Sequence, residues 1–230
     1  MIDTIVDLNH DNDIDLHQVQ SAGILGIIHK ASEGHGFRDP RYRERRDVAI
    51  SLGFLWGAYH FSSADSVQDQ VDNFLDVVQW GDDAARDAKT LLALDFEPSS
   101  HGRPDMSLSQ AHDFVTQINT RTGRFPVIYG GSLLRESVSS TAPDNILRNC
   151  PLWYARYAPQ PIGIPTQTWP AYTFWQYTDG ESGDLPHSVP GMGPSDRNRF
   201  QGTGDDLKRQ WPFATGPTTN QSQQNSSSTN

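Results

Sequence analysis

The stretch Leu91-Leu92-Ala93-Leu94-Asp95-Phe96-Glu97 decides both the fold and the candidate site of this chain. It is a short apolar run that ends in two carboxylates, which is typical of a buried strand of a parallel sheet. Because side chains alternate along a strand, Asp95 and Glu97 leave it on the same face. Active sites of α/β barrels lie at the carboxyl ends of the strands, and paired carboxylates in unlike surroundings can cleave a glycosidic bond. A strand that runs out into solvent would also explain the pair.

The composition excludes several classes of function. The 230 residues carry a formal net charge of -10 and one cysteine, Cys150. Surfaces that bind nucleic acid or anionic membranes are normally basic, so neither is an expected partner. A lone cysteine permits no intramolecular disulfide and no cysteine metal cluster, and no H-E-x-x-H, phosphate-binding loop, dinucleotide fingerprint or G-x-S-x-G occurs. We expect no metal and no cofactor.

Strand and helix patterns alternate through the first two thirds of the chain. The predicted strands span residues 2–8, 24–30, 54–61, 91–97 and 125–130. A helical pattern follows each of them, the last and poorest over 132–148. This alternation predicts a parallel sheet with right-handed crossovers.

Capping residues set the expected helix ends. Asp39, Asp65 and Ser107 are the predicted caps of the second, third and fourth helices, the last two with glutamine at capping-box spacing. Gly81 and Gly123 are the predicted stops of the third and fourth helices.

The last third of the chain has a different pattern. Predicted strands at 151–157, 171–177 and 195–200 are separated by segments too rich in proline and glycine for helices. Five βα units followed by three strands without helices predict a single irregular, flattened α/β barrel, with hairpin-like, partly antiparallel pairing in its last third. We expect the barrel domain to span 1–213, and 214–230, rich in Ser, Thr, Asn and Gln, to be a disordered tail.

Acidic and aromatic residues gather near the predicted strand ends. The acids are Asp7, Asp95, Glu97 and Asp196, and the aromatics are Tyr59, Tyr129, Trp153, Tyr157, Trp175 and Tyr177. Sugar rings stack on aromatic planes while their hydroxyls bind carboxylates and amides, so this combination favours a saccharide cleft. Aromatic residues in strands also serve as core, which is the alternative interpretation.

Eight short motifs follow one another along residues 2–202. They are Ile5-Val6-Asp7, Lys30-Ala31-Ser32-Glu33-Gly34, Gly57-Ala58-Tyr59-His60-Phe61, Leu94-Asp95-Phe96-Glu97, Pro126-Val127-Ile128-Tyr129, Leu152-Trp153-Tyr154-Ala155-Arg156-Tyr157, Trp175-Gln176-Tyr177 and Asp196-Arg197-Asn198-Arg199-Phe200. In this order they resemble the strand motifs of the glycoside hydrolase family 25 lysozymes, the Chalaropsis-type muramidases.

The resemblance implies a flattened barrel of five βα units and three further strands. It also implies cleavage of the β-1,4 bond between N-acetylmuramic acid and N-acetylglucosamine in peptidoglycan, whose glycan strands would be the partner of a monomeric enzyme. By matched position Glu97 would be the general acid and Asp95 its partner, with Asp7 and Asp196 as further acids of the cleft. The candidate substrate-binding residues from the same motifs are Glu33, Tyr59, Tyr129, Trp153, Arg156, Trp175 and Gln176.

Two rival functions and the stereochemistry stay open at this stage. A chitinase-like barrel also places D-x-E at a strand end, but its D-x-D-x-E pattern has a further acid where this chain has Ala93. A non-catalytic saccharide-binding barrel is the rival from another class. Rotamers decide whether the carboxylate separation suits a retaining or an inverting enzyme, and the substrate's own 2-acetamido group could act as the nucleophile.

The expected place of action is the cell wall, outside the cytoplasmic membrane. No stretch approaches the ~18–20 apolar residues of a membrane span, and the first residues lack the basic and apolar regions of a signal peptide. We therefore expect either that another agent releases the enzyme or that the sequence is a processed, secreted form.

Overall fold

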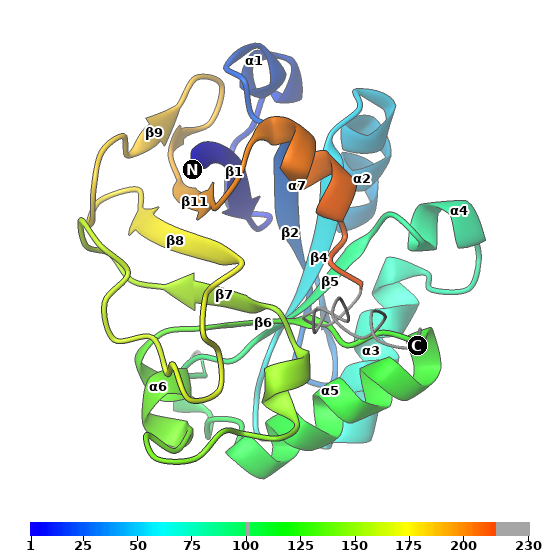
Figure 1. Cartoon of the computed structure of the whole chain (residues 1–230). Helices are drawn as coiled ribbons and strands as arrows, with labels where there is room; N and C mark the ends of the chain where they lie inside the picture. Colours follow the sequence, from blue (N-terminus) through cyan, green and yellow to red (C-terminus); the bar gives the residue numbers. More distant parts are fainter. Residues whose placement is uncertain (100–101, 215–230) are drawn as a thin grey trace, which may run out of the picture.

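Eight strands close into a barrel in the computed structural model, which describes residues 1–99 and 102–214. Around the barrel they run in the order β1, β11, β8, β7, β6, β5, β4 and β2, and β2 pairs with β1 again (Figure 1). Their bounds are β1 Ile2–Leu8, β2 Gly26–Glu33, β4 Leu55–Phe61, β5 Leu91–Asp95, β6 Val127–Gly130, β7 Leu152–Ala155, β8 Phe174–Asp179 and β11 Asp196–Phe200. The predicted irregular α/β barrel is confirmed.

Only one strand of the barrel runs antiparallel to its neighbours. Neighbouring strands are parallel from β1 through β2, β4, β5, β6 and β7 to β8. β11 is antiparallel to both β8 and β1. The predicted partly antiparallel closure therefore comes from β11 alone, because the long irregular segment between β7 and β8 returns the chain as a helical crossover would.

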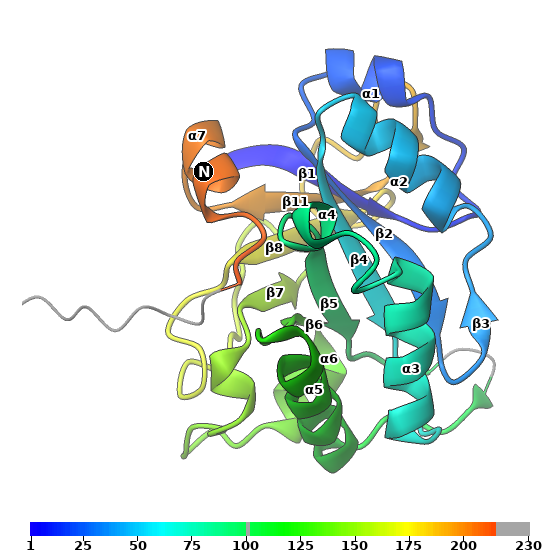
Figure 2. The same ribbon diagram turned by 90° about the vertical axis from the view of Figure 1, so that its right-hand side faces the viewer.

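Helices cover the outside of the first half of the barrel. They are α1 Leu16–Ser21, α2 Tyr42–Ser51, α3 Val67–Val78, α4 Ala84–Asp87, α5 Leu108–Thr122, α6 Ser132–Ser137 and α7 Gly204–Gln210, with a 3-10 turn at Leu147–Asn149. Three short strands, β3 Phe37–Arg38, β9 Ser188–Val189 and β10 Gly193–Pro194, complete the described elements. Figure 2 shows α2, α3 and α5 along the outer side of β2, β4 and β5. No helix in the described part of the chain is long and apolar enough to cross a membrane.

The predicted ends of α5 are confirmed. Ser107 and Gln110 form a reciprocal capping box, and Gly123 ends the helix with a left-handed φ of 78°. Asp39 binds the backbone N–H of Arg41 at 2.9 Å ahead of α2, but Arg41 itself occupies the cap position. The prediction for that helix start is therefore off by two residues.

Both predicted ends of α3 are wrong. Ser66 caps the helix, because the carboxylate of Asp65 instead accepts a hydrogen bond from Ser63 Oγ at 2.8 Å. Gln79 adopts the left-handed conformation, with φ of 60°, before the chain reaches Gly81. The helix is thus two residues shorter than the glycine rule predicts.

The predicted helix over 132–148 is wrong beyond Ser137. The chain leaves the helical conformation there and forms only the 3-10 turn at Leu147–Asn149. Pro143 lies between the two, and proline breaks helix hydrogen bonding. α4 and α7 were not predicted, since helices of four and seven residues are too short to show an apolar period.

α7 closes the end of the barrel at which the strands begin. Leu207 of α7 is fully buried with the side chains inside the barrel, among them Ile5 and Leu91. Trp211 follows, and its indole N–H donates to the carbonyl oxygens of Trp56 at 3.2 Å and Lys89 at 3.0 Å. Side chains of the described chain therefore close this end of the barrel, and the strands finish at the opposite end.

No helix in the described part of the chain covers the outer face of β8 and β11, and an arginine takes that place. Arg199 lies over the rings of Tyr177 and Trp175, at 3.9 and 5.1 Å from their centroids. Asp184, in the loop after β8, pairs with Arg199 at 2.9 Å. Cation–π contact and an ion pair thus seal this part of the barrel.

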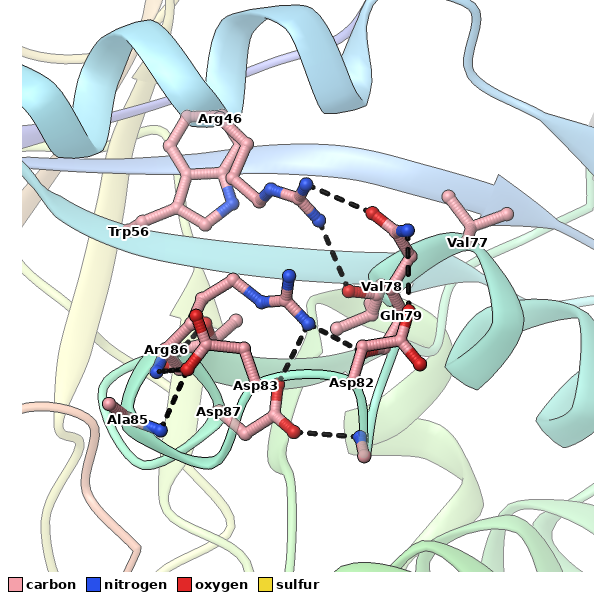
Figure 3. Close-up of polar contacts among 12 residues, drawn as sticks. Arg46, Trp56, Val77, Val78, Gln79, Asp82, Asp83, Ala85, Arg86 and Asp87 are labelled. Atoms are coloured by element: carbon pink, nitrogen blue, oxygen red, sulfur yellow. Dashed lines mark hydrogen bonds and ion pairs between the residues drawn. The ribbon is translucent and has the colours of Figure 1, made fainter.

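Arginines from two neighbouring helices bind the carbonyl oxygens at the C-terminus of α3 (Figure 3). Arg46 of α2 donates to the carbonyl oxygen of Val78 at 3.2 Å and to Gln79 Oε1 at 3.0 Å, and Arg86 of α4 donates to the carbonyl oxygen of Gln79. Asp87 pairs with Arg86 at 3.3 Å. The last carbonyls of a helix lack partners within it and carry partial negative charge, so cationic donors stabilise this end.

Replacing the buried arginine of this cluster should destabilise the fold. Arg46→Met keeps the apolar stem but removes the donors to Val78 and Gln79, and we expect the free energy of unfolding to fall by about 1–3 kcal/mol. Urea unfolding at fixed pH measures it. Arg43→Met is the matched control, because Arg43 also donates to carbonyl oxygens of α3 but is exposed, and its loss should be smaller. Equal losses in both variants would contradict the argument.

Candidate active site

The site begins where β5 ends. β5 stops at Asp95, two residues earlier than predicted: the backbone N–H of Phe96 makes the last ladder bond to β6, with the carbonyl oxygen of Tyr129 at 2.9 Å, and the chain then turns. Phe96 is fully buried, whereas Glu97 is half-buried. The turn keeps Asp95 and Glu97 close enough for the charge of Glu97 to raise the pKa of Asp95.

Four carboxylates predicted as cleft acids lie near one another at this end of the barrel. Asp7, near the end of β1, is the register partner of Asp196 at the start of β11. Asp95 lies on β5, across the barrel mouth, and the charge of Asp7 raises the pKa of Asp95, Glu97 and Asp196. Since like charges at short range cannot all ionise together, this cluster retains protons at neutral pH.

An asparagine and a tryptophan fix the orientation of Asp7 from one side. The indole N–H of Trp153 donates to Asn198 Oδ1 at 2.6 Å, and Asn198 Nδ2 donates to Asp7 Oδ2 at 2.7 Å. Because an indole can only donate, the amide of Asn198 must present its NH₂ group to Asp7. The chain of donors therefore ends on the carboxylate.

A glutamine and two tyrosines fix the orientation of Asp7 from the other side. Gln176 Nε2 donates to both oxygens of Asp7 at 3.0 Å. Gln176 Oε1 in turn accepts from the hydroxyls of Tyr129 at 2.7 Å and Tyr157 at 2.9 Å. Burial raises the pKa of Asp7 to about 6, and the hydrogen bonds from Asn198 and Gln176 oppose that rise. Asp7 is thus an oriented acceptor whose ionised form the amides favour.

Glu97 has the properties of a general acid. Burial raises its pKa to about 7, the charge of Asp7 adds to the rise, and Lys30 and a contact with the hydroxyl of Tyr129 oppose it. A carboxylic acid with this pKa is still partly protonated at neutral pH and can give its proton to a leaving oxygen.

The other two carboxylates are also shifted upward. Burial first, and then the charge of Glu97, raise the pKa of Asp95 well above its usual range. Burial and the charges of Asp7 and Asp179 raise the pKa of Asp196 to about 9. One oxygen of Asp95, Oδ1, is shielded from solvent and has no hydrogen-bond partner in the described part of the chain.

Lys30 brings a positive charge next to these acids. Its ammonium group lies 2.6 Å from Glu33 Oε2 and 4.7 Å from the ring centroid of Phe61, the register partner of Asp95. Arg103 lies on the other side of Glu33, at 3.8 Å. Lys30 lowers the pKa of Asp95, as it does for Glu97. Glu33, predicted to bind substrate, therefore holds Lys30 in place in this structure.

The predicted aromatic residues lie in three places: beside the acids, inside the barrel and on the outer face of β8. Tyr59 is half-buried near the acids, and burial first, then the charges of all four acids, raise its pKa. Trp153 is only 2% exposed and packs at 4.7 Å against Tyr129, inside the barrel. Trp175 is 1% exposed and lies with Tyr177 on the outer face of β8, opposite to Gln176. The structure thus brings Tyr59, Tyr129 and Gln176 to the acids and places Trp175 away from them.

The comparisons with known proteins agree with this geometry. The family model described as glycosyl hydrolases family 25 matches residues 6–184. The chain belongs to glycosyl hydrolase family 25. The resemblance of its eight motifs to that family is therefore confirmed, and the protein is a glycoside hydrolase.

Relatives of this family 25 enzyme are similar over most of its length. Lysozyme M1 of Streptomyces globisporus is 30% identical over 213 residues, 86% of this chain and 67% of that protein. An N,O-diacetylmuramidase of Arthroderma benhamiae is 30% identical over 175 residues, 72% of each. Among solved structures, a bacterial lysozyme from Streptomyces coelicolor has a TM-score of 0.70 at 32% identity, covering 88% of this chain and 94% of its own. A family 25 lysozyme from Aspergillus fumigatus has a TM-score of 0.72 at 26% identity, covering 92% and 98%.

The sequence assigned no role to Asn198 and placed Tyr157 only among the aromatic residues near strand ends, but both belong to the hydrogen-bond network around Asp7. Asn198 lies two residues after Asp196, so strand alternation places it on the same face, and this spacing could have identified it. Tyr157 follows β7 and is 40% exposed, with its hydroxyl on Gln176. Its position near a strand end was visible, but its partner is 19 residues away in the sequence.

Proposed function

We propose that Glu97 is the general acid that cleaves the β-1,4 bond between N-acetylmuramic acid and N-acetylglucosamine. As a family 25 enzyme the protein is a muramidase, a lysozyme that hydrolyses peptidoglycan. The observation that supports the role of Glu97 is its pKa of about 7 in a cleft shared with three other acids. Protonating a glycosidic oxygen near neutral pH requires an acid of this kind.

Asp95 is the proposed partner of Glu97 in a substrate-assisted reaction. The 2-acetamido group of the muramic acid attacks its own anomeric carbon, and Asp95 orients that group by accepting its N–H. Asp95 ends β5 two residues before Glu97, close enough for the charge of Glu97 to raise its pKa, and this placement supports the role. Asp7 and Asp196 complete the acid cluster: Asp7 raises the pKa of Glu97 and Asp196 lies beside it on the neighbouring strand.

The proposed substrate contacts follow the positions just described. Tyr59, Tyr129 and Gln176 contact the sugars, because they lie among the acids. Trp153 acts by holding Asn198, and Trp175 is left out because it lies on the outer face of β8.

We also propose that residues 1–213 form one catalytic domain that acts as a monomer on the cell wall, outside the cytoplasmic membrane. Phe213 packs with Phe174 and Phe200 in the interior cluster, which supports a domain that extends that far. Of the predicted tail 214–230, only Ala214 is among the described residues.

Digestion of two polymers followed by mass spectrometry tests the proposal. Purified peptidoglycan should yield fragments with N-acetylmuramic acid at the reducing end, and chitin should yield none. Soluble products from chitin would favour a chitinase-like enzyme, and no products from either polymer would favour a saccharide-binding protein. NMR of the first-formed anomer tests the substrate-assisted step: net retention is expected, and net inversion would refute it.

A further inference from the structure

A cavity of about 300 Å³ extends from Glu97 toward two arginines. Its walls include Ser132 and Arg135 of α6, and Arg156 and Tyr157, which follow β7. The hydroxyl of Tyr157 also donates a hydrogen bond to Gln176, so the cavity lies beside the residues that orient Asp7. We call it the arginine pocket.

Arg156 has hydrogen-bond donors that no described residue uses. Its side chain is half-buried and makes no ion pair or hydrogen bond within residues 1–99 and 102–214. The Nε–H is shielded from solvent and also has no partner there. A guanidinium offers five donors, and shielding one without a partner is unfavourable. Since Nε is closed to solvent, the donors open to a bound acceptor are those of the two terminal nitrogens, which no described residue uses.

Arg135 is the second cation of the pocket and is barely neutralised. Its one ion pair within the described part of the chain is with Glu136 at 3.9 Å, and that glutamate side chain is 71% exposed. An exposed pair at this distance contributes little. In a chain with net charge -10, two such guanidinium groups beside an acid cluster form a local positive region.

We propose that the arginine pocket binds a carboxylate on the lactyl side of the muramic acid, an inference that rests on the proposed function. Muramic acid differs from glucosamine by a lactyl ether that ends in a carboxyl group. In peptidoglycan that carboxyl is either free or joined to a peptide whose residues carry carboxylates of their own. A carboxylate suits a pair of guanidinium groups, which bind it through two parallel hydrogen bonds.

The neighbouring acids argue for a single carboxylate and against a larger anion. Glu97 forms one wall of the pocket, and Asp7 lies behind Gln176. A polyphosphate or nucleic acid would bring several negative charges against these carboxylates, which is unfavourable. The two arginines can offset one negative charge at the pocket while the cleft keeps its protonated acid.

Kinetics on three soluble glycans test the proposal. The first carries its peptides, the second has them removed so that the lactyl carboxylates are free, and the third is the second with those carboxyls converted to neutral amides. For Arg156→Gln, the ratio of kcat/KM on a charged glycan to kcat/KM on the neutral amide should fall about 10- to 100-fold, chiefly through KM. Loss confined to the peptide-bearing glycan identifies the peptide as the source, and loss on the free-acid glycan identifies the lactyl group.

Two further variants keep the test decisive. Arg135→Gln should lower the same ratio and serves if Arg156→Gln fails to fold, as thermal unfolding would reveal. Arg148→Gln is the matched control, because Arg148 is an exposed arginine that precedes β7 and forms no ion pair with any described residue; its ratio should stay unchanged. An unchanged ratio in both pocket variants overturns this proposal while leaving the proposed function intact. A wild-type enzyme that cleaves none of the three glycans overturns the proposed function instead.

Discussion

Glu97→Gln should fold normally and lose most of its activity on peptidoglycan. The amide keeps the shape of the side chain but has no proton to give, and general acid catalysis contributes ~10²–10⁴-fold to the rate. We expect kcat to fall by that factor, while affinity for soluble glycan fragments stays near that of the wild type. Release of soluble fragments measures kcat, and thermal unfolding establishes that the variant is folded.

Two other variants serve as comparisons for Glu97→Gln. Glu44→Gln makes the same chemical change on the exposed surface of α2 and should leave activity unaltered. Asp95→Asn should lose less activity than Glu97→Gln, because an amide can still orient the acetamido group. Equal and complete loss in the Asp95 and Glu97 variants would instead indicate that Asp95 is a direct nucleophile.

The strands of the barrel were predictable because a buried strand is a run of apolar residues, which is visible in the local sequence. β1 was predicted with both ends correct, and the apolar run before Asp95 located β5. Ends that depend on turns were less predictable: β5 stops two residues before its predicted end, after Phe96 has made the last ladder bond to Tyr129. α7 is too short to show an apolar helical period. Its packing stabilises it instead, because Leu207 and Trp211 fill the end of the barrel at which the strands begin.

The acids of the site were predictable, and the residues that orient them were not. Asp7, Asp95 and Glu97 follow apolar strand patterns, so their places at the strand ends could be inferred from neighbouring residues. Asn198 meets Asp7 across 191 positions of sequence, and no local pattern reports that contact. Trp153 was predicted to contact sugar from its place near a strand end, but its side chain faces inward, where it supports Asn198.

Asp7→Asn should lower the pKa of Glu97 and destabilise the fold. Asp7 accepts hydrogen bonds from the NH₂ groups of Gln176 and Asn198, and the amide of Asn198 cannot turn over because the indole of Trp153 can only donate to its oxygen. An asparagine would place its own NH₂ against one of these donors, at an expected cost of about 1–3 kcal/mol in unfolding free energy. The charge of Asp7 also raises the pKa of Glu97, so its removal should lower that pKa.

The pH profile of this variant distinguishes an electrostatic from a purely structural role for Asp7. In the proposed mechanism the protonated form of Glu97 is the active one, so a lower pKa moves the high-pH limb of kcat/KM toward acid. If the limb moves by about one pH unit, the protonated fraction at higher pH is roughly tenfold smaller. Asp11→Asn, the same change at an exposed position, should leave the limb at the wild-type position, which the pKa of Glu97 predicts near pH 7. If Asp7→Asn is destabilised but its limb does not move, Asp7 serves the fold alone and something else sets the acidity of Glu97.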